Sequence, residues 1–211
     1  QRNAKPCPLL EVLEPGEFKT KFLSLNADIR TDIPLYNIYR KGRLQKPVRE
    51  IKNFWKEDFV SFLLGCSFSF EEAMLRAKIP VRHIEENKNV PMFITHISCK
   101  PAGVFHGPMV VTMRPIPSEK FARAVQITSR YASVHGAPIH IGEPSAIGIK
   151  DLRKPDFGDP VTIKKGEIPV FWACGVTPQA VVMKARPDLC ITHVPGYMFI
   201  SDLLNEELAS L

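Results

Sequence analysis

Proline and glycine interrupt this chain along its whole length, and that limits how long any helix or strand can be. The 211 residues include 19 prolines and 12 glycines, distributed through all parts of the sequence. Proline breaks helix interiors and strand ladders, and glycine marks turns. The sequence therefore predicts many short elements joined by turns, rather than a bundle of long helices.

Short apolar and β-branched runs predict strands near residues 36–39, 91–97, 108–115, 138–141, 168–173, 191–194 and 197–200. Apolar residues at helical spacing predict helices over 17–25, twice within 55–77, and over 119–131. Strands and helices follow one another without a strict βαβ rhythm. The predicted class is therefore α+β, with mixed α/β as the alternative, in a single compact domain over residues 1–211.

Charge and cysteine content exclude several classes of protein. The net charge is +6, but the basic residues are scattered and no nucleic-acid-binding motif is present, so we expect no nucleic-acid partner. No apolar run reaches the roughly 18 residues of a membrane-spanning helix, and no secretory signal is visible. The five cysteines are far apart and form no C-x-x-C pair, which favours a reducing compartment.

The run Gly65-Cys66-Ser67-Phe68-Ser69-Phe70-Glu71-Glu72 is the first candidate site. Apolar residues over 59–64 predict a helix that ends at Gly65. Ser69 and Glu72 have the spacing of a capping box, which places Cys66 and Ser67 beside a helix N-terminus, where backbone N–H groups can bind an anion. Cys66 could be a nucleophile, but a buried structural thiol is favoured, and Ser67 could donate to a substrate carboxylate.

Three further polar residues are candidates for substrate binding because they lie at strand ends or turns. Arg114, near the end of the 108–115 strand, could grip a carboxylate through two N–H bonds, or could be an ordinary salt-bridged arginine. Thr177 is predicted to cap a short helix that follows a strand, which makes another anion site. His193 lies beside a Pro-Gly turn.

His140 and Glu143 flank Gly142, so their side chains could converge as an acid–base pair. The same pair could also bind a divalent cation such as Mn²⁺ or Mg²⁺, although no metal ligand set is assigned. The alternative is a strand histidine satisfied by backbone hydrogen bonds, with Glu143 in solvent. The residues alone leave the two interpretations open.

Taken together and in this order, six segments resemble one family. The chain is similar to the putative hydro-lyase family of bacteria, and through it to the amino-terminal part of mitochondrial D-glutamate cyclase of animals. The segments are 65–71, 107–115, 126–130, 135–142, 171–179 and 191–196. Gln1 to Leu10 looks like an internal stretch of that family, so we expect a chain truncated at its N-terminus.

The resemblance implies a carbon–oxygen hydro-lyase acting on a small anionic acid, with D-glutamate converted to 5-oxo-D-proline and water as the favoured reaction. For such a reaction, the residue patterns described above lead us to expect His140 and Glu143 as the catalytic pair, and Ser67, Arg114, Thr177 and His193 as substrate-binding residues. The resemblance is compatible with a bacterial cytoplasm or a mitochondrial matrix, and with a homo-oligomer or a partner domain, because the animal enzyme has a further C-terminal domain. Two alternatives are a non-catalytic module that binds a small molecule or metal for a partner domain, and an enzyme dependent on Cys66.

Overall fold

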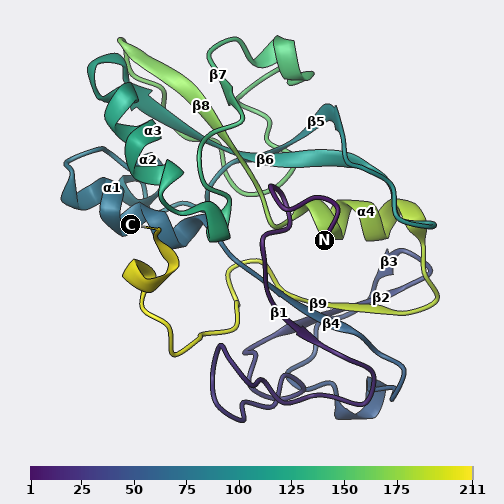
Figure 1. The fold of residues 1–211 in the computed structure, drawn as a ribbon. Coiled ribbons are helices and arrows are strands. Elements are labelled where there is room, and N and C mark those ends of the chain that lie inside the picture. The colour runs from purple at the N-terminus through teal and green to yellow at the C-terminus, as the bar shows by residue number, and fades with distance from the viewer. Residues whose placement is uncertain (211) are drawn as a thin grey trace.

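The computed structural model describes residues 1–210, and its centre is a four-stranded antiparallel sheet (Figure 1). The strand order is β5-β6-β8-β7. Their bounds are Met92–Ser98 (β5), Pro108–Pro117 (β6), His140–Ile141 (β7) and Glu167–Ala173 (β8). Strand β6 has neighbours on both sides and is buried on both faces between residues 110 and 116. That double burial explains why its sequence is an almost continuous apolar run rather than an alternating one.

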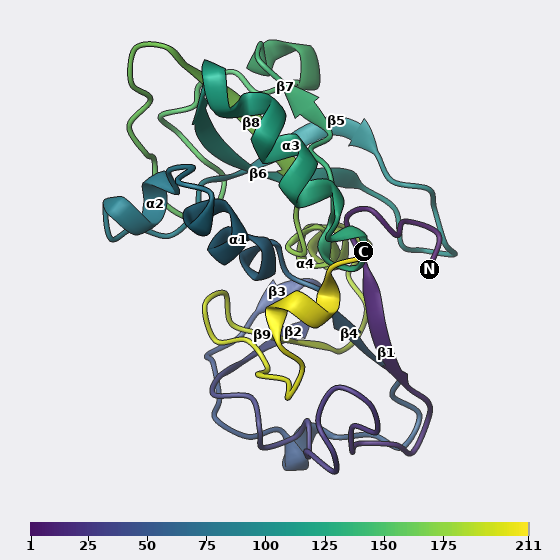
Figure 2. The ribbon, with the colours of Figure 1, turned by 60° about the vertical axis from the view of Figure 1, so that its left-hand side comes forward.

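Three short α-helices lie on one side of this sheet and a fourth packs against β6 (Figures 1 and 2). They are Glu71–Arg76 (α1), Arg82–Glu85 (α2), Phe121–Ser129 (α3) and Thr177–Ala185 (α4). Single-turn 3₁₀ helices cover Lys52–Phe54 (η1), Ser67–Phe70 (η2), Ser118–Lys120 (η3), Ala132–Val134 (η4), Pro144–Ile147 (η5) and Asn205–Leu208 (η6). The chain turns often, as the proline and glycine content predicts.

Each face of the central sheet carries its own apolar core. On the helical face, Met74 of α1 and Ile127 of α3 pack with Trp172 of β8. On the opposite face, Met113 of β6 and Phe171 of β8 pack with Ile147 and its neighbours. Successive side chains of a strand point to opposite faces, so polar side chains on one face of the central sheet are separated by the sheet from those on the other face.

Two smaller sheets lie below the central sheet in Figure 1. Leu9–Leu13 (β1) pairs with Ser61–Leu64 (β4), and Tyr36–Arg40 (β2) lies between Arg43–Leu44 (β3) and Cys190–His193 (β9). The whole is a single compact α+β domain, which confirms the predicted class. Among residues 1–210, no helix is long and apolar enough to cross a membrane.

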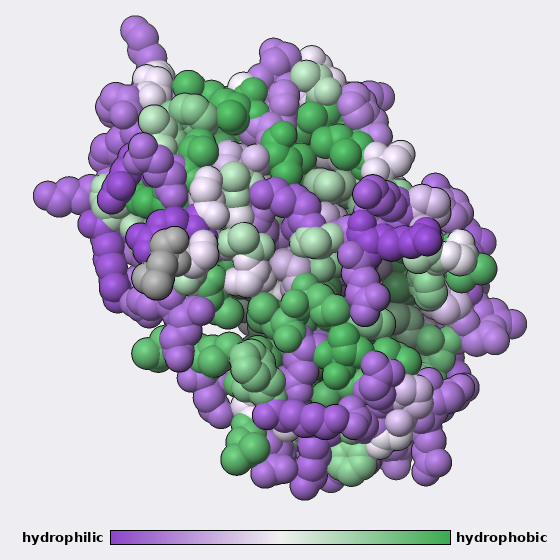
Figure 3. Space-filling model, in the orientation of Figure 1, coloured by the Kyte–Doolittle hydropathy of each residue, from purple (hydrophilic) through white to green (hydrophobic). Residues whose placement is uncertain are grey.

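Large apolar side chains remain exposed on the loops around the smaller sheets and near the C-terminal end. Figure 3 shows hydrophobic residues gathered on the lower half of one face, between hydrophilic ones. Among the described residues, the most exposed large apolar side chains are Phe22, Leu25, Val104, Ile200 and Leu204, of which Val104 lies between β5 and β6. The predicted homo-oligomer or partner domain stays a prediction.

Several predicted elements were wrong in type. Within the segment 59–64, Ser61–Leu64 form strand β4 and no helix forms, because the short apolar run also fits a strand and β1 supplies a partner, with Val12 opposite Phe62. The segment 17–25 is irregular and bent, with one isolated bridge from Lys19 to Asp28. The carboxylate of Glu11 accepts the backbone N–H groups of Lys21 and Leu23 there. No strand forms over 197–200.

The predicted helix caps were also wrong. Ser69 lies inside η2, which runs directly into α1, so Phe70 precedes the helix and no side chain caps it. Glu72 pairs with Arg76 instead of closing a capping box. Thr177 is the first residue of α4 rather than its cap. Its hydroxyl accepts the N–H of Val110 at 3.0 Å and donates to the carbonyl of Cys174 at 2.7 Å, which fixes the helix to β6.

Candidate active site

The turn from Gly65 to Ser67 connects β4 to η2 and lies against the loop that follows α3. A Cβ atom added at Gly65 would lie 2.4 Å from the carbonyl oxygen of Ser133 and 2.5 Å from Val134 Cγ1. Contacts this short do not occur in proteins, so the backbone approach depends on glycine. The turn is thereby placed between Arg114 on the central sheet and His135 on the neighbouring loop.

Arg114 is fully buried on the helical face of β6 and is held by four hydrogen bonds. Its Nε donates to Glu71 Oε1 at 2.9 Å, and its Nη2 donates to the same oxygen. Nη1 donates to Thr112 Oγ1 at 2.9 Å, and Nη2 also donates to Ser67 Oγ at 3.2 Å. Two donors of Arg114 thus hold a single carboxylate oxygen, and that carboxylate is Glu71 of the chain itself. This is the salt-bridged arginine of the alternative interpretation, and binding of a substrate carboxylate by Arg114 stays a prediction.

Aromatic rings enclose this guanidinium and keep water away from it. Its central carbon lies 5.2 Å from the ring centre of Phe70 and 5.4 Å from that of Trp172. Cation–π attraction adds to the hydrogen bonds, and it strengthens when the cation is desolvated. Arg114 thus has a rigid position and a fixed counter-ion.

Glu71 connects this arginine to a histidine. His83 Nε2 lies 3.2 Å from Glu71 Oε1, and both side chains are buried. Burial opposes ionisation of Glu71, but the charges of Arg114 and His83 and their hydrogen bonds outweigh it, so the pKa of Glu71 is lowered. An ionised carboxylate in contact with an imidazole can orient the ring and stabilise its protonated form.

His135 approaches the Gly65 turn from the other side. It is buried and adopts a left-handed backbone conformation, with φ of 84°, which is uncommon for a residue other than glycine. Its Nδ1 lies 2.9 Å from the carbonyl oxygen of Lys5. Burial, the largest effect, lowers the pKa of His135 to about 4, aided by the charges of Arg114 and Lys5 and opposed by backbone hydrogen bonds. The imidazole is neutral at pH 7, and because a carbonyl can only accept, Nδ1 carries the proton.

The cysteines at this place are poorly suited to nucleophilic chemistry. Burial raises the pKa of the Cys66 thiol, and it raises the pKa of Cys174 to about 12. The thiolate is the reactive form of cysteine, so both groups are held in their unreactive state at neutral pH. This geometry favours the structural role of Cys66 over a cysteine-dependent enzyme.

His140 and Glu143 lie on the other face of the central sheet from Arg114. His140 pairs in register with Phe171, and their ring centres are 5.6 Å apart, on the side of the sheet that Met113 also faces. Its Nε2 donates to the backbone carbonyl of Glu143 at 2.7 Å, while the Glu143 side chain is exposed and accepts the N–H of Ser145. This is the arrangement of the alternative interpretation, and a catalytic role for the pair stays a prediction.

The structure thus brings together only two of the six predicted site residues, Ser67 and Arg114. Thr177 fixes α4 to β6 through its backbone partners, and His193, on β9 of a smaller sheet, contacts the carbonyl of Val194 through Nδ1 at 2.8 Å. Four buried polar groups around Arg114 were not predicted as site residues from the sequence: Glu71, His83, Thr112 and His135. One feature of the sequence could have indicated this network. Thr112 and Arg114, a hydroxyl and a charged side chain, lie two positions apart in an otherwise apolar strand and therefore on the same face of it.

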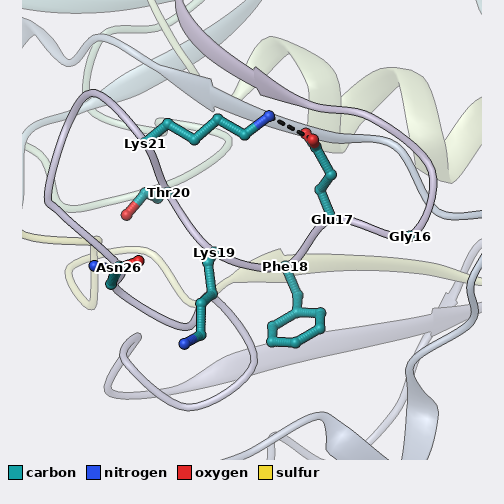
Figure 4. A pocket seen from close by; sticks show the side chains of 7 residues that line it. All are labelled: Gly16, Glu17, Phe18, Lys19, Thr20, Lys21 and Asn26. Atoms are coloured by element: carbon teal, nitrogen blue, oxygen red, sulfur yellow. Dashed lines mark hydrogen bonds and ion pairs between the residues drawn. The ribbon is translucent and has the colours of Figure 1, made fainter.

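Hollows on the surface lie elsewhere. One of about 310 Å³ is lined by residues 16–21 and Asn26. Figure 4 shows that one of its two lysines, Lys21, is paired with the carboxylate of Glu17. A second, of about 260 Å³, is lined by residues 93–94, 148–151, Lys154 and Asp156. Neither includes a member of the Arg114 network. Within residues 1–210, no three His, Cys, Asp or Glu side chains are grouped as a metal site.

Comparison with known proteins gives one consistent result. The sequence model of the D-glutamate cyclase family matches residues 60–202. A putative hydro-lyase of Thermoanaerobacter sp. (strain X514) is 64% identical over 208 residues, covering 99% of this chain and 78% of the relative. A putative hydro-lyase of Stutzerimonas stutzeri is 61% identical over 99% of this chain and 78% of its own length. One of Bacillus licheniformis is 59% identical over 100% of this chain and 80% of its own length.

Proposed function

The chain belongs to the D-glutamate cyclase family, and on this premise we propose that it is a hydro-lyase that converts D-glutamate to 5-oxo-D-proline and water. The observation that carries the proposal is the buried network of Ser67, Glu71, His83 and Arg114. It combines a hydroxyl donor, an ionised carboxylate and a histidine around a fixed cation. Bacterial relatives named as hydro-lyases cover nearly the whole chain, the network included.

The reaction requires protons to move from nitrogen to oxygen. The substrate nitrogen attacks the carbon of the γ-carboxylate, a C–N bond forms and a C–O bond breaks. Two protons pass from the substrate ammonium to the departing oxygen, which leaves as water. A single base that takes each proton and returns it as an acid satisfies this balance.

His83 is the group that we assign to this proton transfer. Glu71, held ionised by Arg114, stabilises the imidazolium that forms when His83 takes a proton from the substrate nitrogen. Arg114 acts through Glu71 and is therefore a positioning residue in this scheme. Ser67 accepts a hydrogen bond from Arg114, so its own O–H is free to donate to the oxyanion that develops on the γ-carboxyl group.

The test is formation of 5-oxo-D-proline from D-glutamate, followed by NMR, with L-glutamate as the stereochemical comparison and with Mn²⁺, Mg²⁺ or EDTA added. We expect His83→Gln to lower kcat about 100-fold or more, and Ser67→Ala to lower it by a factor on the order of 100. His106→Gln is the matched control, because His106 is exposed and outside the network.

Each other outcome has a definite meaning. Absence of product from the wild-type protein refutes the reaction, and binding of D-glutamate without turnover supports the alternative of a non-catalytic module. If His140→Gln abolishes turnover while His83→Gln does not, the acid–base chemistry belongs to the His140–Glu143 turn instead.

A further inference from the structure

The buried network has no positive charge left for a substrate anion. Arg114 donates two hydrogen bonds to Glu71 and one each to Thr112 and Ser67, and Glu71 balances its charge. D-glutamate carries an α-carboxylate that does not react in the proposed cyclisation. Holding that group requires a second cation near the Gly65 turn.

The N-terminal segment brings a lysine to this place. The backbone N–H of Gly65 donates to the carbonyl of Pro8 at 2.8 Å, so residues 5–8 lie along the turn. Figure 2 shows this segment passing beside the loop that follows α3. The backbone carbonyl of Lys5 accepts a hydrogen bond from His135 Nδ1. The ammonium nitrogen of Lys5 lies beside Gly136, 3.4 Å from the position that a Cβ atom of that residue would occupy.

Lys5 differs from the exposed lysines of the chain. Its side chain is partly buried, and burial lowers the pKa of its ammonium group. Within residues 1–210, this ammonium has neither a carboxylate partner nor a hydrogen bond from its Nζ to an acceptor. A cation that has lost part of its hydration without gaining a partner is stabilised when it binds an anion.

We propose that the ammonium group of Lys5 binds the α-carboxylate of the substrate beside the Gly65–Ser67 turn. This inference rests on the proposed function and adds the residue that recognises the carboxylate of the substrate that does not react. The γ-carboxyl group would reach Ser67 while the α-carboxylate stays at Lys5. Since Arg114 is already neutralised, Lys5 takes the carboxylate-binding role that the sequence assigns to Arg114.

The test compares Lys5→Met, which keeps the apolar stem and removes the charge, with Lys5→Arg, which keeps the charge. Lys46→Met is the control at an exposed lysine. We expect Lys5→Met to raise KM for D-glutamate roughly 10- to 100-fold, the worth of one charge-assisted hydrogen bond, with kcat changed less than about threefold. Lys5→Arg should recover part of the loss, and Lys46→Met should change nothing.

A second measurement separates this inference from the proposed function. Binding of 5-oxo-D-proline and of 2-pyrrolidinone, the same ring without the carboxylate, is followed by ligand-observed NMR. Lys5→Met should weaken binding of the first ring and leave the second unchanged. If the wild type gives no turnover but Lys5→Met still loses binding of the carboxylate, the proposed reaction is refuted and the Lys5 site is supported. Turnover with an unchanged KM in Lys5→Met, or no carboxylate binding by the wild type, refutes the Lys5 site.

Discussion

Replacing Glu71 by glutamine tests whether the buried ion pair organises this fold. Glutamine keeps the shape and an acceptor oxygen but removes the charge that balances Arg114. Arg114 is fully buried, so water cannot replace the lost counter-ion. Leaving one partner of a buried pair uncompensated costs about 3–5 kcal/mol. For a chain of this size, that corresponds to a decrease in Tm of roughly 6–20 °C.

The assay is urea denaturation for the free energy of unfolding and a thermal melt for Tm, both followed by tryptophan fluorescence, because Trp172 lies against Arg114 in the same core. Glu72→Gln is the control one residue away, where an exposed carboxylate pairs with Arg76, and we expect no measurable change there. The double variant Glu71→Gln with Arg114→Met should cost less than the sum of its parts, because neither charge is then left alone.

The same variant should change the response to acid. Because the pKa of Glu71 is lowered in the folded state, its ionised form stabilises the fold above its unfolded pKa near 4.5, and this stability is lost as pH falls through the folded value. Glu71→Gln should remove that part of the acid dependence. A Tm within 2 °C of the wild type, or strict additivity in the double variant, would refute the reasoning.

Three further predictions concern the surroundings of the network. The pKa of His135 falls from 6.5 to about 4 on folding, so the contribution of this residue to stability is complete above pH 6.5 and is lost as pH falls toward 4. His135→Gln should therefore flatten the curve of stability against pH in this range by up to roughly 3 kcal/mol. The control His140→Gln should leave the curve unchanged. Gly65→Ala should lower the free energy of unfolding by about 1–3 kcal/mol or more, while Gly175→Ala, whose Cβ would meet only ordinary contacts, should cost less in the same urea titration. Thr128→Val removes the acceptor of a buried indole N–H and should cost about 1–3 kcal/mol, measured by thermal denaturation; an unchanged Tm would contradict it.

Sequence patterns succeeded where one element has a single strong period and clear ends. The strand at 108–115 and the strand at 168–173 are confirmed as β6 and β8, and they pair in register from Val111–Ala173 to Pro117–Glu167. The helix predicted over 119–131 is found as η3 and α3. In each case burial of a continuous apolar face agrees with the local pattern, so local and global preferences coincide.

The same patterns failed where the partner decides the conformation. Residues 59–64 fit a helix or a strand, and only the presence of β1 beside them favours the strand. The candidate site failed in a similar way. The His140 ring bonds the backbone carbonyl of Glu143 rather than its carboxylate, and the central sheet lies between this turn and Arg114.

The sequence by itself determined the family, the α+β class and the importance of the Gly65–Glu71 run, since these depend on ordered motifs and local composition. Only the tertiary structure decided what that run does. It brings Arg114 onto Glu71 across 43 positions of the chain, and Lys5 onto His135 across 130. Contacts between residues this far apart have no local periodicity, because their distance in space is set by the packing of the sheet and not by spacing along the chain.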